Sequence, residues 1–210
     1  MLQLTNFSKS YHGRPVLRID SFTFAPGIYW LQGANGAGKS TLLKAIAGIT
    51  SFTGDIVLAG QLSVRKQPAA YRRLVNFAEA EPLFPEFLTG HELINLFRTA
   101  KGGPAHQEDF YLESLRMTGF VHEPVGTYSS GMLKKLALVL AFLGRPTCIV
   151  LDEPLTTLDA DAMPILGTWM ADQHAQQGTS FLLSSHQPLA GAVLPAVQPL
   201  LVADTTLRAL

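Results

Sequence analysis

Gly33-Ala34-Asn35-Gly36-Ala37-Gly38-Lys39-Ser40-Thr41 is the stretch of sequence that decides the fold. It matches the phosphate-binding pattern G-x-x-x-x-G-K-[ST] at every specified position. In such a loop, glycines let backbone N–H groups curl around phosphate oxygens, Lys39 brings positive charge to the β- and γ-phosphates, and the Ser40 hydroxyl can bind Mg²⁺. We therefore expect this chain to bind a nucleoside triphosphate.

The residues on either side of this loop favour that interpretation over a glycine-rich linker. Residues 27–32 predict a short buried strand after a Pro26-Gly27 turn, and residues 41–47 predict a helix. A strand, a loop and a helix are the context that the motif requires. The helix N-terminus would add its partial positive charge and free N–H groups to the phosphate site.

Composition indicates a globular protein. The chain has 210 residues, of which 47% are hydrophobic and 15% charged, enough to bury a sizeable core in one compact unit. Lys plus Arg equal Asp plus Glu at 16 each, so the overall charge does not predict a nucleic-acid partner.

Neither a membrane span nor a secretory signal is predicted. The longest strongly apolar stretch, residues 136–144, is far too short to cross a bilayer, and the N-terminus has no basic region followed by an apolar core. We therefore expect a cytosolic location. The single cysteine, Cys148, offers no disulfide framework and lies in an apolar run, which predicts a core residue rather than a reactive thiol.

The pattern along the chain predicts an α/β fold with a helical insertion. Short β-rich pieces in residues 1–32 (2–7, 22–24 and 28–31) predict an antiparallel β-layer, and further strands are expected at residues 53–60 and 74–78. From about 84 to 144 the spacing becomes helical, with expected apolar faces of Leu93, Ile94, Leu96 and Phe97; of Phe110, Leu112 and Leu115; and of Leu133, Leu136, Ala137, Leu140 and Ala141.

The remaining chain predicts the rest of a mainly parallel core sheet. Strands are expected at residues 148–151, 181–184 and 200–202, with a helix near 161–177. We expect a single domain over 1–210, with 1–83 and 145–210 forming the α/β core with its β-layer, and about 84–144 forming the helical subdomain.

Two carboxylates end the most apolar strand. Residues 148–151 lead into Asp152 and Glu153, a pattern typical of a buried parallel strand that delivers acids to the edge where ligands bind. Asp152 is placed to help hold Mg²⁺, and Glu153 to polarise an attacking water as a general base. Without the phosphate loop, the same acids would predict only a solvated strand end.

With these motifs, the chain resembles the nucleotide-binding subunit of ABC transporters. Residues 128–132 (Tyr-Ser-Ser-Gly-Met) are similar to that family's Leu-Ser-Gly-Gly-Gln signature and precede a predicted helix. The resemblance runs nearly end to end, with its pieces in the family's order: an aromatic residue, the phosphate loop, the signature, the two acids, Leu158-Asp159 and a histidine. It implies a P-loop ATPase core with an inserted helical subdomain.

The resemblance also implies roles for individual residues. ATP would be bound by Tyr11, stacked on adenine, and by the loop residues Gly33, Asn35, Gly36, Ala37, Gly38, Lys39, Ser40 and Thr41. The signature residues would meet the γ-phosphate of a nucleotide held by the other subunit of a head-to-tail dimer that sandwiches two ATP molecules; they are Ser129, Ser130, Gly131 and Met132.

Two more positions follow from the same resemblance. Asp159 matches the loop that crosses the dimer interface, although an Asp before a helix is also an ordinary N-cap. His186 matches the histidine that contacts the γ-phosphate and would be catalytic together with Glu153. The bound metal would be Mg²⁺, held by Ser40 and Asp152. The other five histidines are expected to be surface or core residues.

The chain departs from the family at a position of chemical importance. Alignment places Ala80 where the family carries a glutamine that touches Mg²⁺ and the attacking water, and an alanine side chain cannot do either. Glu79 or Glu81 could supply an oxygen instead if the loop shifts by one residue. We expect slow or altered hydrolysis, and Ala80→Gln should raise turnover. Ser130 and Met132 also differ from the commonest signature residues.

The function that the resemblance implies is ATP hydrolysis that drives a separate membrane permease, from the inner face of the cell membrane. The ATPase would form a homodimer or pair with another ABC ATPase, and Leu83, Phe84, Phe87 and Leu88 are candidate docking positions. Two alternatives stay open: a non-transport regulatory ATPase of DNA repair or translation, and a hydrolysis-impaired partner in an asymmetric dimer. We expect neither the coiled-coil insertion nor the second domain that is usual in the former class.

Overall fold

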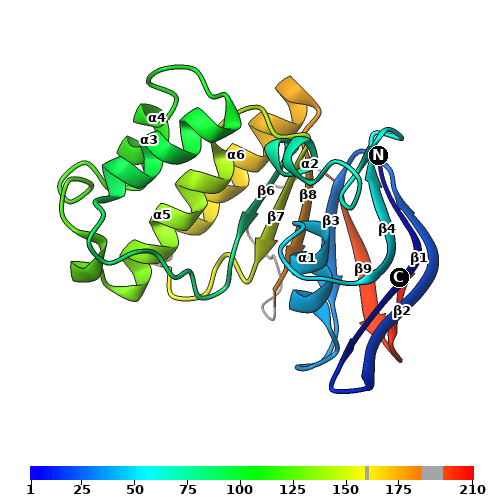
Figure 1. Ribbon diagram of the computed structural model, residues 1–210. Helices are drawn as coiled ribbons and strands as arrows, with labels where there is room; N and C mark the ends of the chain where they lie inside the picture. Colours follow the sequence, from blue (N-terminus) through cyan, green and yellow to red (C-terminus); the bar gives the residue numbers. More distant parts are fainter. Residues whose placement is uncertain (159–160, 186–195) are drawn as a thin grey trace.

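A computed structural model describes residues 1–158, 161–185 and 196–210 of the chain. The described residues form two β-sheets and a group of helices (Figure 1). A six-stranded, mostly parallel sheet lies in the middle, a four-stranded antiparallel sheet lies on one side, and the helices α3, α4 and α5 form a lobe on the other. The fold class predicted from the sequence is confirmed.

The antiparallel sheet has the order β2-β1-β4-β5 and is built from β1 (Leu2–Tyr11), β2 (Arg14–Phe24), β4 (Thr53–Leu58) and β5 (Leu62–Ser63). The pairing of β1 with β4 shifts register between Thr5 and Ser8. Gly54 fits at this irregularity, because a Cβ atom there would lie 2.2 Å from the carbonyl oxygen of Asn6, and its φ of +94° suits glycine.

The central sheet has the order β10-β9-β3-β8-β7-β6. Its strands are β3 (Ile28–Gln32), β6 (Val75–Ala78), β7 (Cys148–Asp152), β8 (Ser180–Ser184), β9 (Val197–Ala203) and β10 (Thr206–Ala209). All neighbouring pairs are parallel except β9 and β10. One expectation was wrong: residues 28–31 belong to this sheet and not to the antiparallel layer, because β3 pairs with β8 and β9.

The helices are α1 (Lys39–Ile46), α2 (Pro68–Leu74), α3 (Gly90–Lys101), α4 (Asp109–Ser114), the 3₁₀ helix η1 (Val125–Thr127), α5 (Ser130–Phe142) and α6 (Ala162–Gln177). A capping box begins α3: the Thr89 side chain accepts a hydrogen bond from Glu92 N, and the Glu92 carboxylate accepts one from Thr89 N. None of the helices in the described part of the chain is long and apolar enough to cross a membrane.

Two positions on the expected apolar faces are wrong. Leu96 and Phe110 are each 58% exposed. In α3 the buried side is set by Leu93 and Ile94; at 100° per residue Leu96 lies about 60° from Leu93 but about 160° from Ile94, so it falls at the exposed edge of that side. In the short helix α4, Leu112 is the residue that is buried.

Strand β7 separates the two hydrophobic cores of the described residues. Its side chains alternate between the faces of the sheet: Ile149 and Leu151 join the core beneath the helical lobe, whereas Cys148 and Val150 join the core shared with α1 and the antiparallel sheet. All five residues of β7 are buried, as its continuous apolar sequence predicts. Asp152 is thereby held rigidly at the end of a strand packed on both faces.

Candidate nucleotide site

The loop between β3 and α1 has the backbone shape that its glycines allow. Gly38 is the N-cap of α1 with φ +104°, and the helix begins at Lys39. A Cβ atom at Gly33 would lie 2.3 Å from the carbonyl oxygen of Val202 on β9, so no larger residue fits there without a shift. The first turn of α1 therefore directs its N–H groups toward the loop.

Lys39 lies beneath the loop. Its side chain is buried, and the Nζ atom donates hydrogen bonds to the carbonyl oxygens of Gly33, at 2.8 Å, and Ala34, at 3.2 Å. These bonds hold the ammonium group against the loop backbone. The position suits a cation that is to meet phosphate oxygens bound by the same loop.

Asp152 accepts two hydrogen bonds on one carboxylate oxygen. Ser40 Oγ donates to Asp152 Oδ1 at 3.0 Å, and Ser184 Oγ donates to the same atom at 2.7 Å. The carboxylate and Ser184 are buried. Sequence reasoning assigned no role to Ser184; its signal was its place at the end of the strand that pairs with β7, opposite Asp152.

Glu153 follows in a strained backbone conformation. Its φ is +47°, uncommon for a residue other than glycine, and its N–H donates to Ser184 Oγ at 3.1 Å. A cavity of about 330 Å³ lies between this residue and the phosphate loop; it is lined by Asn35, Gly36, Gly38, Lys39, Ser40, Thr41 and Glu153. The structure thus brings Glu153 together with six of the loop residues singled out in the sequence.

The oxygen atoms in this site fit a magnesium ion. A hydroxyl and a carboxylate side by side, from Ser40 and Asp152, are hard oxygen donors of the kind that Mg²⁺ prefers alongside phosphate and water. Glu153, on the wall of the same cavity, can accept a proton from a water that attacks a phosphate in the loop. The arrangement can bind a nucleoside triphosphate and hydrolyse it.

Tyr11 lies at the end of β1 and does not line this cavity. The residue is 44% exposed, and the Lys9 ammonium lies 4.6 Å from the centroid of its ring. Lys9 is itself anchored by a 2.6 Å hydrogen bond to the carbonyl oxygen of Ser51. One face of the tyrosine ring is therefore covered by a fixed cation.

The signature residues stand apart from the loop cavity within one chain. Ser129 is the N-cap of α5, and its Oγ accepts a hydrogen bond from Met132 N at 3.3 Å. Ser129 and Ser130 are exposed, and Gly131 lies beside the segment that follows Glu153: a Cβ atom on it would lie 3.1 Å from the carbonyl oxygen of Thr157. Asp159 and His186 lie outside the described residues.

Sequence reasoning also missed two lysines near the site. Lys134 of α5 has no exposed surface, and Lys44 of α1 forms an ion pair with Glu79. Burial lowers the pKa of Lys134 to about 8, against the raising effect of the carboxylates of Asp152, Glu153 and Glu79. A lysine inside an otherwise apolar helix, preceding Leu136, was the available signal for the first of them.

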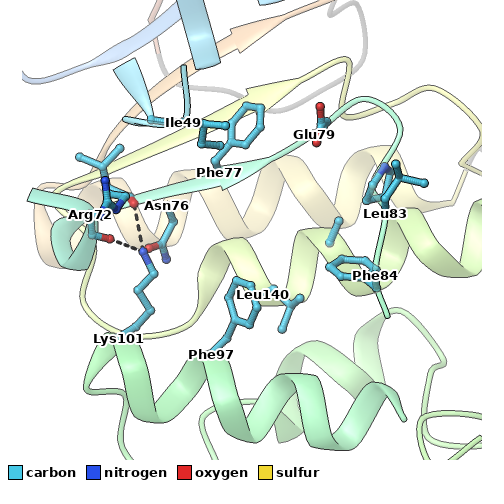
Figure 2. A pocket seen from close by; sticks show the side chains of 14 residues that line it. Ile49, Arg72, Asn76, Phe77, Glu79, Leu83, Phe84, Phe97, Lys101 and Leu140 are labelled. Atoms are coloured by element: carbon cyan, nitrogen blue, oxygen red, sulfur yellow. Dashed lines mark hydrogen bonds between the residues drawn. The ribbon is translucent and has the colours of Figure 1, made fainter. Parts of the chain in front are cut away.

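A groove lies between the helical lobe and the central sheet (Figure 2). Its volume is about 260 Å³, and its lining includes Ile49, Phe77, Leu83, Phe84, Phe97 and Leu140. Arg72, Asn76 and Lys101 stand at one end, and Glu79 stands near Leu83 at the other. Burial, together with a smaller effect of the nearby Arg72 charge, lowers the pKa of Lys101 to about 8.

Comparisons with known proteins agree with this geometry. The family model described as "ABC transporter" matches residues 17–156. An uncharacterised ABC transporter ATP-binding protein of Bacillus subtilis is 30% identical over 189 residues, which cover 89% of this chain and 62% of that protein. The phospholipid-transporting ATPase ABCA7 of Homo sapiens is 33% identical over 194 residues, which cover 89% of this chain and 9% of that protein.

Solved structures share the fold over almost the whole chain. An ATP-binding subunit of an ABC transporter superposes with a TM-score of 0.86 and 27% identity, covering 98% of this chain and 87% of that one. A dimeric ATP-binding cassette in a post-hydrolysis state with ADP and phosphate has a TM-score of 0.82 and 20% identity, covering 100% and 98%. The chain therefore belongs to the ABC transporter family, as an ATP-binding ATPase cassette.

Proposed function

We propose that this chain binds MgATP in the loop cavity and hydrolyses it in a head-to-tail dimer that drives a membrane permease. The observation that carries the proposal is the placement of Lys39, Ser40 and Glu153 around one cavity, with Asp152 hydrogen-bonded to Ser40. In that arrangement the loop and Lys39 bind the phosphates, Ser40 and Asp152 hold Mg²⁺, and Glu153 takes a proton from the attacking water.

Bound Mg²⁺ would neutralise charge that develops on the phosphate oxygens. The chain's own contribution is to hold its groups in place before reaction. The Asp152 carboxylate accepts hydrogen bonds from Ser40 and Ser184, and the Ser184 hydroxyl also accepts one from the backbone N–H of Glu153. Such preorganisation lowers the barrier because little rearrangement is then needed in the transition state.

The position of the signature supports a dimer with shared sites. The exposed residues Ser129 and Ser130 at the N-terminus of α5 do not line the loop cavity of their own chain. A helix N-terminus with a free face suits an anion from a second subunit, which supports a head-to-tail arrangement. Tyr11, Asp159 and His186 keep the roles of adenine contact, interface residue and γ-phosphate contact as parts of this proposal.

The groove between the lobes is the proposed site of the permease. Leu83, which lines it, and Phe87, four residues further along the chain, are 92% and 81% exposed, which is unusual for large apolar side chains, whereas Phe84 and Leu88 pack partly against the core. An apolar groove with exposed apolar residues at its edge suits a helix from a partner. The cassette would then lie at the inner face of the membrane through that partner.

The test of ATP hydrolysis compares wild type with Glu153→Gln, while dimerisation is followed by size-exclusion chromatography. We expect Mg²⁺-dependent turnover in wild type, its loss in Glu153→Gln, and an ATP-stabilised dimer of that variant. Glu113→Gln, on an exposed position of α4, is the matched control and should behave as wild type. ATP binding without turnover in wild type would instead favour the hydrolysis-impaired partner of an asymmetric dimer.

The shared sites can be tested by mixing two inactive variants. Lys39→Ala removes the phosphate lysine and Ser129→Arg blocks the signature, so a mixed head-to-tail dimer keeps one intact site of its two. With random pairing, half of the dimers are mixed, and about one quarter of wild-type activity should return. No recovery on mixing would contradict a composite site. Copurification with a second ABC ATPase would indicate a heterodimer.

A further inference from the structure

The segment Glu79–Ala80 lies next to the catalytic end of the sheet. Strand β6 pairs with β7 so that Ala78 stands opposite Leu151, and the chain therefore leaves β6 beside Asp152. Ala80 has only a methyl group to offer a metal or a water. Whatever fixes this segment relative to Asp152 must therefore act through its backbone or through a neighbouring side chain.

Lys134 fixes the backbone of the segment. Its Nζ atom donates to the carbonyl oxygens of Glu79 at 2.9 Å, Ala80 at 3.1 Å and Asp152 at 3.1 Å. These three bonds use all three donors of the ammonium group, which has no exposed surface. One buried side chain of α5 thus joins the ends of β6 and β7, immediately before Glu153.

The Lys44–Glu79 ion pair fixes the side chain of the same segment. Lys44 is one helical turn after Ser40 on α1, so the two residues share a face of that helix. The hydrogen bond to Glu79 is the main cause that raises the pKa of Lys44. The Glu79 carboxylate, considered above as a substitute oxygen donor, forms an ion pair with Lys44. Glu79 also lines one end of the groove.

We propose that Lys134 and the Lys44–Glu79 pair are positioning residues. They would hold α5, the segment 79–80 and α1 together, and so replace the glutamine that the family carries at the position of Ala80. This inference rests on the proposed ATP hydrolysis at Glu153. The contacts form a continuous path from α5 through Glu79 to α1. Because Glu79 also lines the groove, a partner that occupies the groove meets a carboxylate on that path.

The path predicts which kinetic constant changes. The Lys134 ammonium donates to the carbonyl oxygens of Glu79, Ala80 and Asp152, and none of these three residues belongs to the phosphate loop. Loss of the Lys134 side chain should make the backbone at Asp152 more mobile and thereby disturb the orientation of the Glu153 carboxylate. The binding of ATP through Lys39 and Ser40 should change little, so kcat should fall while KM for MgATP stays nearly constant.

The first experiment measures kcat and KM for MgATP in wild type, Lys134→Met and Lys134→Arg. We expect Lys134→Met to lower kcat by about 10- to 100-fold with KM within about threefold, and Lys134→Arg to recover part of the loss. Lys66→Met, at an exposed lysine, is the control. An unchanged kcat in a folded Lys134→Met protein overturns the proposal, and so does an equal loss for Lys66→Met.

The second experiment exchanges the charges of the surface-accessible pair. Lys44→Glu and Glu79→Lys should each lower kcat, and the double variant should recover part of it; no recovery overturns the role of the pair. The side chains of Lys44 and Glu79 are about one third exposed (35% and 38%), so these variants should fold. They therefore still test the proposal if Lys134→Met fails to fold.

A third measurement separates this inference from the proposed function. Amide hydrogen exchange of nucleotide-free protein should become faster in residues 79–81 and 152–153 of Lys134→Met than of wild type. Absence of ATP turnover in wild type would refute the proposed function. The exchange rates would still test whether Lys134 holds the backbone of these two segments. Unchanged exchange in both segments would overturn the inference even if wild type hydrolyses ATP.

Discussion

Ser184 controls two neighbouring residues through one oxygen atom. Its Oγ donates to the Asp152 carboxylate and accepts from the Glu153 N–H, so it satisfies an acceptor and a donor in a buried place. Removing it leaves both groups short of a partner, and an unsatisfied buried group costs more than an average hydrogen bond contributes. Ser184 is thus the residue on which both acids of the site depend.

We predict that Ser184→Ala lowers the free energy of unfolding by about 1–3 kcal/mol. It should also lower kcat, because the backbone of Glu153 loses its hydrogen bond. Urea denaturation followed by circular dichroism measures the first effect, and steady-state ATP hydrolysis measures the second. Ser21→Ala, an exposed serine of β2, should change neither quantity. Equal behaviour of the two variants would contradict the assigned role.

Cys148 should be an inert thiol in the native protein. Burial in the core raises its pKa to about 12. Relative to an ordinary thiol of pKa 9.0, the thiolate fraction near pH 8 falls by about 1000-fold. We expect alkylation by iodoacetamide to be negligible in native protein and rapid in urea; rapid native alkylation would place the thiol at the surface.

The same shift has a consequence for stability. The folded-state pKa lies above the ordinary value, so the unfolded chain loses its proton first, and the contribution of the neutral thiol is complete below pH 9 and declines toward pH 12. Cys148→Ala removes this titration. The difference in unfolding free energy between wild type and the variant should therefore become smaller as the pH rises above 9.

At the scale of elements, α3 and α5 each begin with a hydroxyl side chain that accepts a hydrogen bond from the backbone N–H of the third helical residue, but only one of these caps has a proposed function. Ser129 caps α5 and is also a proposed contact to a second subunit, so its substitution would mix two effects. Thr89 caps α3 in a reciprocal arrangement with Glu92 and belongs to no proposed site. The capping of α3 is therefore the cleaner place to measure what a helix start contributes here.

We predict that Thr89→Ala lowers the free energy of unfolding by about 1 kcal/mol. Thr99→Ala, at an exposed interior position of the same helix, should have little effect and is the control. Hydrogen bonds from Thr89 lower the pKa of Glu92 below its ordinary 4.5, so the capping contribution is present above that pH and is lost as the pH falls further. The gap between wild type and Thr89→Ala should accordingly narrow on acidification; a constant gap would contradict the reciprocal cap.

At the scale of the whole molecule, the nucleotide cavity lies where both hydrophobic cores meet the central sheet. Asp152 ends β7, whose side chains enter both cores, and α1 packs against β7 and β8. The binding of a ligand by the loop therefore depends on both cores being folded. Unfolding of either one should release it.

We predict that MgATP raises the melting temperature by roughly 5–10 °C at about 100 times its dissociation constant, since binding then adds about 2.7 kcal/mol of stability to a protein of this size. Glu153→Gln provides the version without turnover for this measurement. Lys39→Ala should lose most of the shift and Lys66→Ala should keep it. Differential scanning fluorimetry is sufficient, and equal shifts in both lysine variants would exclude Lys39 from binding.

Local patterns were enough for much of the fold and for the phosphate loop. The glycines of residues 33–38, the apolar run of β7 and the helix at 162–177 each depend on neighbours in sequence, so the elements and the acids at the strand end could be predicted. Expectations failed where the outcome depended on residues distant in sequence. Strand β3 belongs to the parallel sheet because β8 and β9 flank it, and Leu96 is exposed because the core packs against the side of α3 centred between Leu93 and Ile94 and leaves the edge at Leu96 uncovered.

The sequence by itself determined the phosphate loop, the alternation of strands and helices, and the family to which the chain belongs, because those features are written in short-range spacing. Only the tertiary structure decided that Ser184 serves both acids and that Lys134 and the Lys44–Glu79 pair fix the segment at Ala80. These contacts join residues 18 to 55 positions apart. No local pattern encodes such partners, since a polar side chain takes whichever group the packed elements bring within reach.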